Sequence, residues 1–175
     1  LPAYGGMAEK IVVDAERVFP LSDRLDFAAG AGLLLTYGTS IHALKDRARM
    51  QPGESLLVLG AGGGAGLSAV ELGKALGLRV IAAVSGEEKA AAARAAGADD
   101  VVLYGRPPFT LEQSRDLSRA FKAACCGEGA QIVYDAVGGD YAEPALRAMA
   151  WGGRYLIVGF AAGIPALPFN LPLLK

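Results

Sequence analysis

From about residue 55 onward, short and wholly apolar runs alternate along the chain with longer stretches rich in alanine and charged residues. An unbroken apolar run between turn residues is typical of a strand buried on both faces of a parallel sheet. The runs that predict strands are 56–59, 79–84, 101–103, 130–134 and 154–158. The stretches that predict helices between them are 67–76, 87–96, 111–126 and 142–150.

This alternation of strands and helices predicts the α/β class, with a doubly wound parallel sheet and right-handed crossovers. We expect the strand order 3-2-1-4-5, with a ligand beyond the carboxyl ends of the first and fourth strands, where the order reverses. A sixth strand is possible at 167–169, because proline is tolerated at the edge of a sheet.

The first 22 residues lack the alternation of apolar runs and helical stretches. Two short apolar segments, 11–13 and 18–21, indicate extended structure, and neither has a pairing partner nearby in the sequence. We therefore expect residues 1–22 to be the remnant of a domain that lies upstream. The helices expected before the first strand cover 23–29, where Gly30 and Gly32 interrupt the pattern, and 34–50.

A glycine cluster follows the first predicted strand and opens the next helix, with the spacing Ala61-x-Gly63-x-x-Gly66. In this context each small residue has a physical role: the first permits a tight turn, the second admits a pyrophosphate, and the third lets helix and strand pack closely. The free N–H groups and positive dipole end of the helix then face the anion. The pattern predicts a dinucleotide site.

The end of the second strand indicates which dinucleotide is bound. A site for NAD usually carries an acidic residue there, to hold the ribose 2′-hydroxyl. This chain has Ser85 followed by Gly86, so nothing there would repel a 2′-phosphate, and Lys89 could reach one. Glu87 could instead contact the ribose and favour NAD. We expect NADP, and NAD stays open as the alternative.

Composition narrows the class of protein. The 175 residues are 53% hydrophobic with a net charge of -1, so nothing indicates nucleic acid or an anionic membrane as partner. No apolar run suggests a membrane span, and no signal-peptide pattern follows Leu1. Cys125 and Cys126 are adjacent and His42 is the sole histidine, which does not suit a zinc site. We expect a cytoplasmic protein without a metal.

Several further stretches occur in a characteristic order: 12–21, 35–39, 61–66, 97–99, 135–138 and 152–154. Together they resemble the medium-chain dehydrogenase/reductase superfamily, in its zinc-independent quinone oxidoreductase branch. The zinc-dependent branch has a cysteine ligand just before the helix that holds Thr36, where this chain has Ala31, Gly32 and Leu33. Asp135 is interpreted either as a strand-end residue that caps the next helix or as a catalytic acid.

The resemblance implies a role for particular positions. It implies that residues 1–22 belong to a GroES-like catalytic domain and residues 23–175 to an NAD(P)-binding Rossmann domain. No catalytic residue is assigned. The cofactor-binding positions it implies are Thr36 near the nicotinamide; Gly63, Gly64 and Ala65 at the pyrophosphate; Ser85, Lys89 and Tyr104 at the 2′-phosphate; Val137 and Gly138 on the nicotinamide side; and Gly159, Phe160 and Ala161 beside the nicotinamide amide.

The function implied by the resemblance is hydride transfer from NADPH to a quinone or an activated alkene, with the small-molecule substrate bound in a full-length enzyme. The chain alone would then bind cofactor without turnover. A homodimer through the last strands is also expected. The alternatives are an enoyl reductase domain of a polyketide synthase and a nucleotide-binding module without catalysis.

Overall fold

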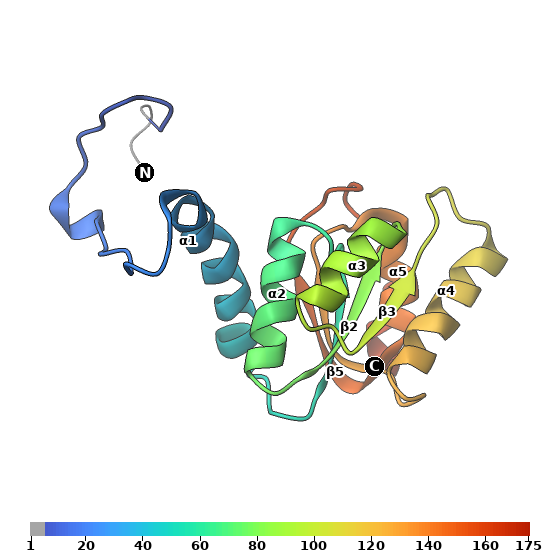
Figure 1. The fold of residues 1–175 in the computed structure, drawn as a ribbon. Coiled ribbons are helices and arrows are strands. Elements are labelled where there is room, and N and C mark those ends of the chain that lie inside the picture. Colours follow the sequence, from blue (N-terminus) through green and yellow to red (C-terminus); the bar gives the residue numbers. More distant parts are fainter. Residues whose placement is uncertain (1–5) are drawn as a thin grey trace. The chain divides into compact units, whose positions relative to one another are not determined.

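The computed structural model describes residues 6–175 and divides the chain into two compact units, Leu1–Leu33 and Leu34–Lys175. Residues 1–5 of the predicted upstream remnant lie outside the described part. The second unit holds a sheet with helices packed beside it (Figure 1). The sheet has five parallel strands in the order β3-β2-β1-β4-β5, which confirms the predicted fold class. The strands are β1 (Ser55–Leu59), β2 (Arg79–Val84), β3 (Asp100–Leu103), β4 (Ala130–Asp135) and β5 (Met149–Ile157).

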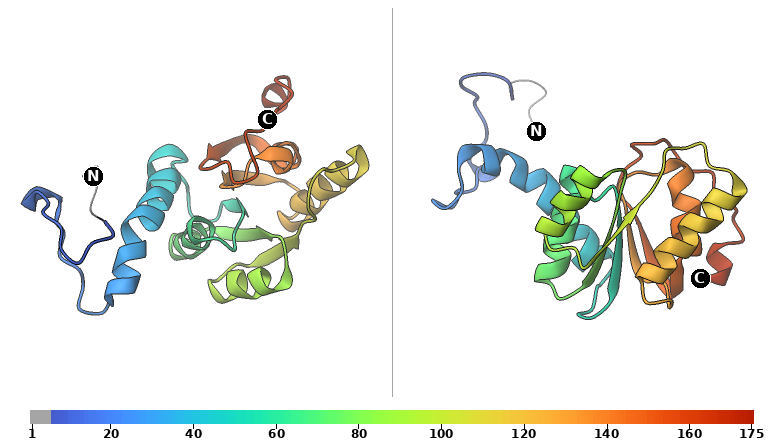
Figure 2. Two further views of the ribbon diagram at one scale, coloured as in Figure 1. Left: turned by 90° about the horizontal axis from the view of Figure 1, so that it is seen from above. Right: turned by 45° about the vertical axis from the view of Figure 1, so that its right-hand side comes forward.

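Helices cover both faces of the sheet, as the two views in Figure 2 show. They are α2 (Gly64–Ala75), α3 (Glu87–Ala95), α4 (Leu111–Ala124) and α5 (Ala142–Arg147), with short helical turns at Gly139–Tyr141 and Pro172–Leu174. The side chains of β1 alternate between two apolar layers. Leu56 and Val58 pack in the layer of α2 and α3, and Leu57 and Leu59 pack in the layer of α4 and α5. Burial on both faces explains the unbroken apolar runs.

The helix predictions at the start of the chain were wrong. A single helix α1 (Phe27–Ile41) passes through Gly30 and Gly32 and continues into a π-helical segment, His42–Arg47. Gly30 does not break the helix; it makes room for Leu21, whose Cδ2 would lie 2.7 Å from a Cβ at this position. Within the first unit, a short helical turn forms at Ala15–Arg17, and neither 11–13 nor 18–21 is a strand.

The continuous helix also corrects the expectation that no run could span a membrane. The stretch Phe27–Arg47 has 21 residues and a mean hydropathy of 1.2, so it is long and apolar enough to do so by length and composition. Helices that pack on the core of a protein can have the same length and hydropathy. In the second unit Ser40, Ala43 and Leu44 are buried, and both apolar residues belong to the core on the α2 face.

Other elements also differ from the predictions; α2, for example, begins at Gly64 and not at residue 67. Residues 167–169 form no strand in the described structure, so the possible sixth strand is absent there; Pro168 has no N–H to donate to a ladder. The helix expected at 142–150 ends at Arg147, and β5 begins at Met149. A register shift between Ala130 and Ile132 lets this early part of β5 pair with β4.

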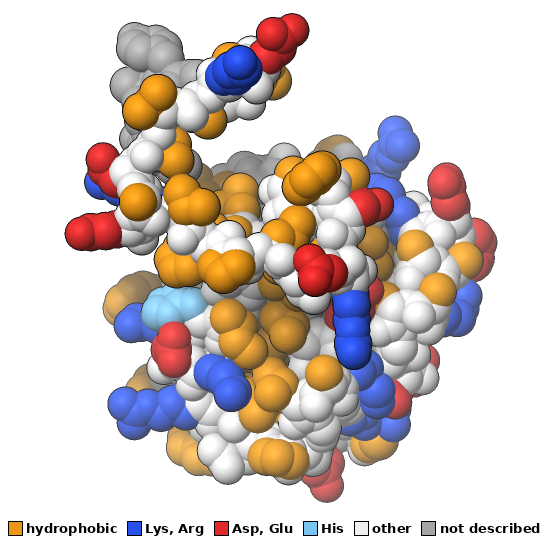
Figure 3. Space-filling model, turned by 60° about the vertical axis from the view of Figure 1, so that its left-hand side comes forward, with side chains coloured by type: hydrophobic (Ala, Val, Ile, Leu, Met, Phe, Trp, Pro, Cys, Tyr) orange, Lys and Arg blue, Asp and Glu red, His pale blue; other side chains and the backbone are white. Residues whose placement is uncertain are grey.

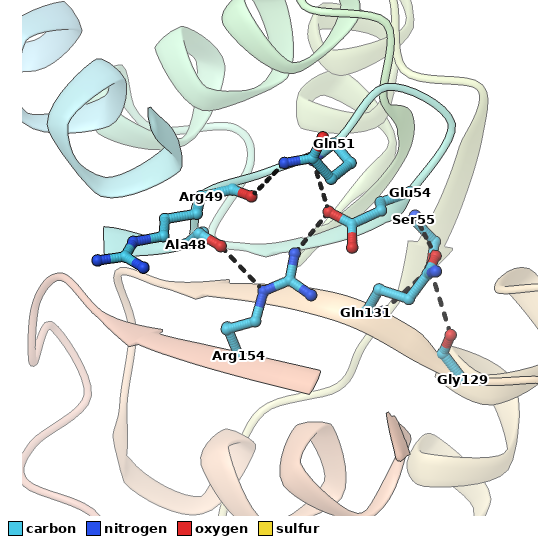
Figure 4. Close-up of polar contacts among 8 residues, drawn as sticks. All are labelled: Ala48, Arg49, Gln51, Glu54, Ser55, Gly129, Gln131 and Arg154. Carbon is cyan, nitrogen blue, oxygen red and sulfur yellow. Dashed lines mark hydrogen bonds and ion pairs between the residues drawn. The ribbon is translucent and has the colours of Figure 1, made fainter. Parts of the chain in front are cut away.

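Buried polar contacts hold the sheet at the amino ends of its strands (Figure 4). The Ser55 Oγ donates to the Gly129 carbonyl at 3.2 Å, and the Gln131 N–H donates back to Ser55 Oγ at 3.1 Å. Arg154 of β5 donates to the Ala48 carbonyl at 3.0 Å and to the carboxylate of Glu54. Burial would raise the pKa of Glu54, but its hydrogen bonds from Arg154 and a backbone N–H outweigh burial and lower that pKa.

Candidate functional site

The turn between β1 and α2 is held by direct contact between backbones. Gly60 has φ +74° and its carbonyl accepts the N–H of Gly63 at 3.0 Å. A Cβ on Gly66 would lie 2.2 Å from that carbonyl oxygen, so the first turn of α2 can approach β1 only with glycine there. The structure thus agrees with the role assigned to Gly66 from its spacing.

Gly63 and Gly64 have space that the protein itself does not fill. A Cβ on Gly63 would meet only the Gly60 carbonyl oxygen at 3.6 Å, and one on Gly64 would meet Thr36 Cγ2 at 3.6 Å. The Gly63 position at the N-terminus of α2 supplies no side-chain cap. The first N–H groups of α2, those of Gly64, Ala65 and Gly66, receive no side-chain cap from Gly63, and a helix terminus of this kind is suited to an anion. This geometry fits a pyrophosphate, because a close ligand would explain two glycines that packing does not require.

Ser85 and Lys89 meet above the same turn. The Lys89 Nζ donates to the Ser85 Oγ at 3.2 Å. A Cβ on Gly62 would lie 2.6–2.9 Å from Cβ, Cγ and Cδ of Lys89, so the lysine stem crosses the glycine turn. The structure brings these two predicted residues together at the end of β2, and contact with a 2′-phosphate stays a prediction.

Tyr104 stands at the end of β3 in a small aromatic cluster. Its ring centroid lies 4.6 Å from that of Tyr141, which in turn lies 5.2 Å from that of Phe109. Burial and the neighbouring Tyr141 raise the pKa of Tyr104 to about 12, although an interaction with the Gly60 backbone opposes the shift. Tyr104 therefore keeps its proton at neutral pH and lies beside the glycine turn.

The loops after β4 and β5 pack against each other beside the turn. The N–H of Ala162 donates to the Val137 carbonyl at 2.7 Å. A Cβ on Gly138 would lie 2.5 Å from the Gly163 carbonyl oxygen and 3.5 Å from Phe160 Cα. Val137 also approaches Gly60, because its Cγ2 would lie 2.7 Å from a Cβ there. The predicted positions Val137, Gly138, Gly159, Phe160 and Ala161 all belong to these two loops.

Asp135 joins the two loops. Its side chain is buried, with 2% exposed, and its Oδ1 accepts the N–H groups of Val137 and Gly138, both at 2.8 Å. Its Oδ2 accepts the Tyr155 hydroxyl at 2.7 Å. Both carboxylate oxygens are thus engaged within the fold, which favours the structural interpretation of Asp135 over the catalytic one. Sequence reasoning missed Tyr155. The available signal was a tyrosine within an apolar predicted strand, because a tyrosine hydroxyl that is buried needs a partner.

A second buried hydroxyl cluster was also missed, and it lies under the start of α2. Ser40 Oγ lies 2.8 Å from Ser68 Oγ and 2.9 Å from the Tyr134 hydroxyl. Ser68 Oγ in turn lies 3.1 Å from the Thr36 carbonyl and 2.9 Å from the Ala65 carbonyl. These contacts tie α1 to α2, and Thr36 lies next to Gly64. Its contact with the nicotinamide stays a prediction.

Comparison with known proteins agrees with this geometry. Residues 64–175 match the family described as zinc-binding dehydrogenase. The chain is 38% identical over 177 residues to quinone oxidoreductase-like protein 2 of Bos taurus, which covers 100% of this chain and 48% of that protein. The chain belongs to the medium-chain dehydrogenase/reductase superfamily, in its quinone oxidoreductase branch. It spans about half the length of the curated relatives it matches.

Two other similar proteins indicate which cofactor and which classes of enzyme are relevant to this chain. The quinone oxidoreductase of Thermus thermophilus, solved also in complex with NADPH, superposes with a TM-score of 0.78 at 33% identity, covering 98% of this chain and 52% of that chain. A pikromycin polyketide synthase component of Streptomyces venezuelae is 34% identical over 155 residues, which is 89% of this chain and 4% of that protein. The family thus supports NAD(P) binding in an oxidoreductase.

Although the matched superfamily model is described as zinc-binding, the donor set of the described residues does not fit zinc. No group of three or more His, Cys, Asp or Glu side chains comes together within residues 6–175. The single histidine, pale blue in Figure 3, lies on the surface, where His42 Nδ1 is 2.7 Å from Asp46 Oδ2. We derive no step through a metal, and the zinc-independent assignment stays a prediction.

Proposed function

We propose that this chain is the NADPH-binding half of an oxidoreductase that transfers hydride between the cofactor and a quinone or an activated alkene. The observation that carries the proposal is the arrangement of Lys89, which crosses Gly62 and donates to Ser85 at the end of β2. An ammonium group there offers a charge-assisted hydrogen bond to a 2′-phosphate. The NADPH complex of the Thermus thermophilus relative supports this choice.

In the proposed complex each part of the site has a distinct task. The N–H groups at the start of α2 would hold the pyrophosphate, and the Ser85 and Tyr104 hydroxyls would add neutral donors to Lys89 at the 2′-phosphate. The loops after β4 and β5 would orient the nicotinamide and shield it from water. The cofactor itself supplies hydride transfer when bound, and the protein supplies binding, orientation and electrostatics.

Titration calorimetry with NADPH and NADH tests the proposal on the chain as it stands. Since a hydrogen bond to a charged group contributes about 1.5–3 kcal/mol, and about 1.4 kcal/mol is tenfold in affinity, we expect NADPH to bind roughly ten- to a hundredfold more tightly. Equal affinities would contradict the NADP assignment, with Glu87 as the residue to examine next. Failure of both dinucleotides to bind would contradict the site itself.

Two other functions remain candidates for the longer protein. An enoyl reductase domain of a polyketide synthase is favoured by the match to the pikromycin synthase component. Quinones and enoyl thioesters both accept hydride at an activated double bond, so the cofactor half would serve either enzyme. A nucleotide-binding module without catalysis is the third candidate. Assays of the longer protein with NADPH and each class of acceptor separate the three, and the chain alone is proposed to bind without turnover.

We also propose a homodimer through β5, in a cytoplasmic protein. β5 is an edge strand, and an unpaired edge presents free N–H and C=O groups for pairing. Its Trp151 and Ile157 side chains are exposed, at 81% and 63%. Light scattering should give twice the monomer mass, and Ile157→Lys should halve it, whereas Leu111→Lys on the exposed side of α4 should not. A monomer at high concentration counts against the proposal.

A further inference from the structure

Asp135 bonds to the ends of both loops on the nicotinamide side of the proposed site. Its Oδ1 accepts the N–H groups of Val137 and Gly138 in the loop after β4. Its backbone carbonyl accepts the N–H groups of Val158 at 2.8 Å and Gly159 at 3.1 Å, where β5 ends. Any rotation of the carboxylate would therefore release the first loop while the second stayed attached.

Tyr155 controls that rotation. Its hydroxyl donates to Asp135 Oδ2 at 2.7 Å, and it is the side-chain donor to this carboxylate among the hydrogen bonds of residues 6–175. A buried carboxylate is costly unless hydrogen bonds satisfy it, and here two backbone N–H groups and one hydroxyl do so. Burial and the adjacent Asp135 raise the pKa of Tyr155, so the hydroxyl remains a donor at neutral pH.

We propose that Tyr155 is a positioning residue for the nicotinamide half of the cofactor. By holding Asp135 Oδ2, it keeps Oδ1 directed at Val137 and Gly138 and so sets the loop that packs on Phe160. The inference rests on the proposed function, because that function assigns these loops to the nicotinamide. It goes further by separating this half of the site from the 2′-phosphate end, where Tyr155 makes no contact among those described.

The test compares two ligands on wild type and Tyr155→Phe by titration calorimetry. NADPH has both halves, whereas adenosine 2′,5′-bisphosphate has the 2′-phosphate and the adenosine but no nicotinamide. Because a hydrogen bond to a buried charge is lost, we expect Tyr155→Phe to weaken NADPH about tenfold and to leave the bisphosphate within twofold of wild type. A purely structural role of Tyr155 would weaken both ligands alike and would overturn the inference.

A matched control separates positioning from loss of stability. Ser55→Ala also removes a buried hydroxyl, one that bonds to the Gly129 carbonyl at the amino end of β1 (Figure 4), and it should leave both affinities unchanged. If Tyr155→Phe does not fold, Asp135→Asn is the second variant, since its amide keeps Oδ1 and can donate to the Tyr155 oxygen. For Asp135→Asn the inference predicts that the affinity for NADPH falls by less than threefold while the affinity for the bisphosphate does not change. An equal loss of affinity for both ligands overturns the inference.

Failure of the inference is distinguishable from failure of the proposed function. If wild type binds neither ligand, the proposed function is contradicted, and so is the inference that rests on it. If wild type binds both ligands with equal affinity, the 2′-phosphate end stands, but the loops do not hold the nicotinamide. That outcome overturns the inference together with the assignment of these loops to the nicotinamide, while the 2′-phosphate part of the proposed function stands.

Discussion

Gly66→Ala should abolish NADPH binding and lower the free energy of unfolding by about 3 kcal/mol, which is the upper end of the usual cost of overpacking. The added Cβ would lie 2.2 Å from the Gly60 carbonyl oxygen and 2.7 Å from Ala61 Cα. Both contacts are with backbone atoms, so no side chain can rotate away to relieve them. Either α2 moves off the sheet or the turn opens, and each change displaces the N–H groups proposed to hold the pyrophosphate.

Gly63→Ala is the matched control for this prediction. Gly63 has φ -95° and ψ 166°, which alanine adopts freely, and its Cβ would touch only the Gly60 carbonyl oxygen at 3.6 Å. Stability should therefore stay within about 1 kcal/mol of wild type, while NADPH binding falls because the methyl group projects where the pyrophosphate approaches. Urea unfolding followed by circular dichroism, together with calorimetry, checks both variants. A Gly66→Ala protein as stable as wild type would contradict the packing argument.

The three central strands β1, β2 and β4 could be predicted because they are buried on both faces, whereas the edge strands β3 and β5 are only partly buried. β1 is buried at every residue from Ser55 to Leu59, and β2 at every residue after Arg79. One failure lies where a glycine has a tertiary role. Gly30 was interpreted as a break in a helix, yet it makes room for Leu21 inside a continuous one. Sequence alone does not distinguish a glycine that ends a helix from one that accommodates a neighbour.

In the candidate site, too, contacts between residues close in sequence could be predicted and contacts between distant residues could not. Ser85 follows β2 directly and Lys89 lies in the first turn of α3, so the two residues are close along the chain and their approach could be predicted. The contact between Asp135 and Tyr155 joins two different strands, and that between Ser40 and Tyr134 joins a helix to a strand. Such contacts depend on strand order and on which face each residue takes. The spacing motif therefore predicted the glycine turn, whereas the hydroxyls that pack beneath it were missed.

The second large effect is expected in the relative affinities for NADPH and NADH. Lys89→Ala should weaken NADPH roughly ten- to a hundredfold, since a charge-assisted hydrogen bond contributes about 1.5–3 kcal/mol, and it should change NADH little. Alanine also removes the stem that packs over Gly62. Lys89→Met keeps that packing and removes only the charge, so it should reproduce the loss for NADPH. If only the alanine variant loses affinity, the lysine stem matters and its charge does not.

Ser85→Asp should go further than either lysine variant and reverse the preference. The carboxylate would stand at the end of β2, beside Lys89, where it would repel a 2′-phosphate and accept a hydrogen bond from the ribose 2′-hydroxyl of NADH. It would also pair with the ammonium that now donates to the Ser85 hydroxyl. Calorimetry with both dinucleotides should therefore show NADPH weakened by more than in Lys89→Met and NADH strengthened. A Ser85→Asp protein that still prefers NADPH would place the 2′-phosphate away from the end of β2, and the NADP assignment would lose the geometry on which it rests.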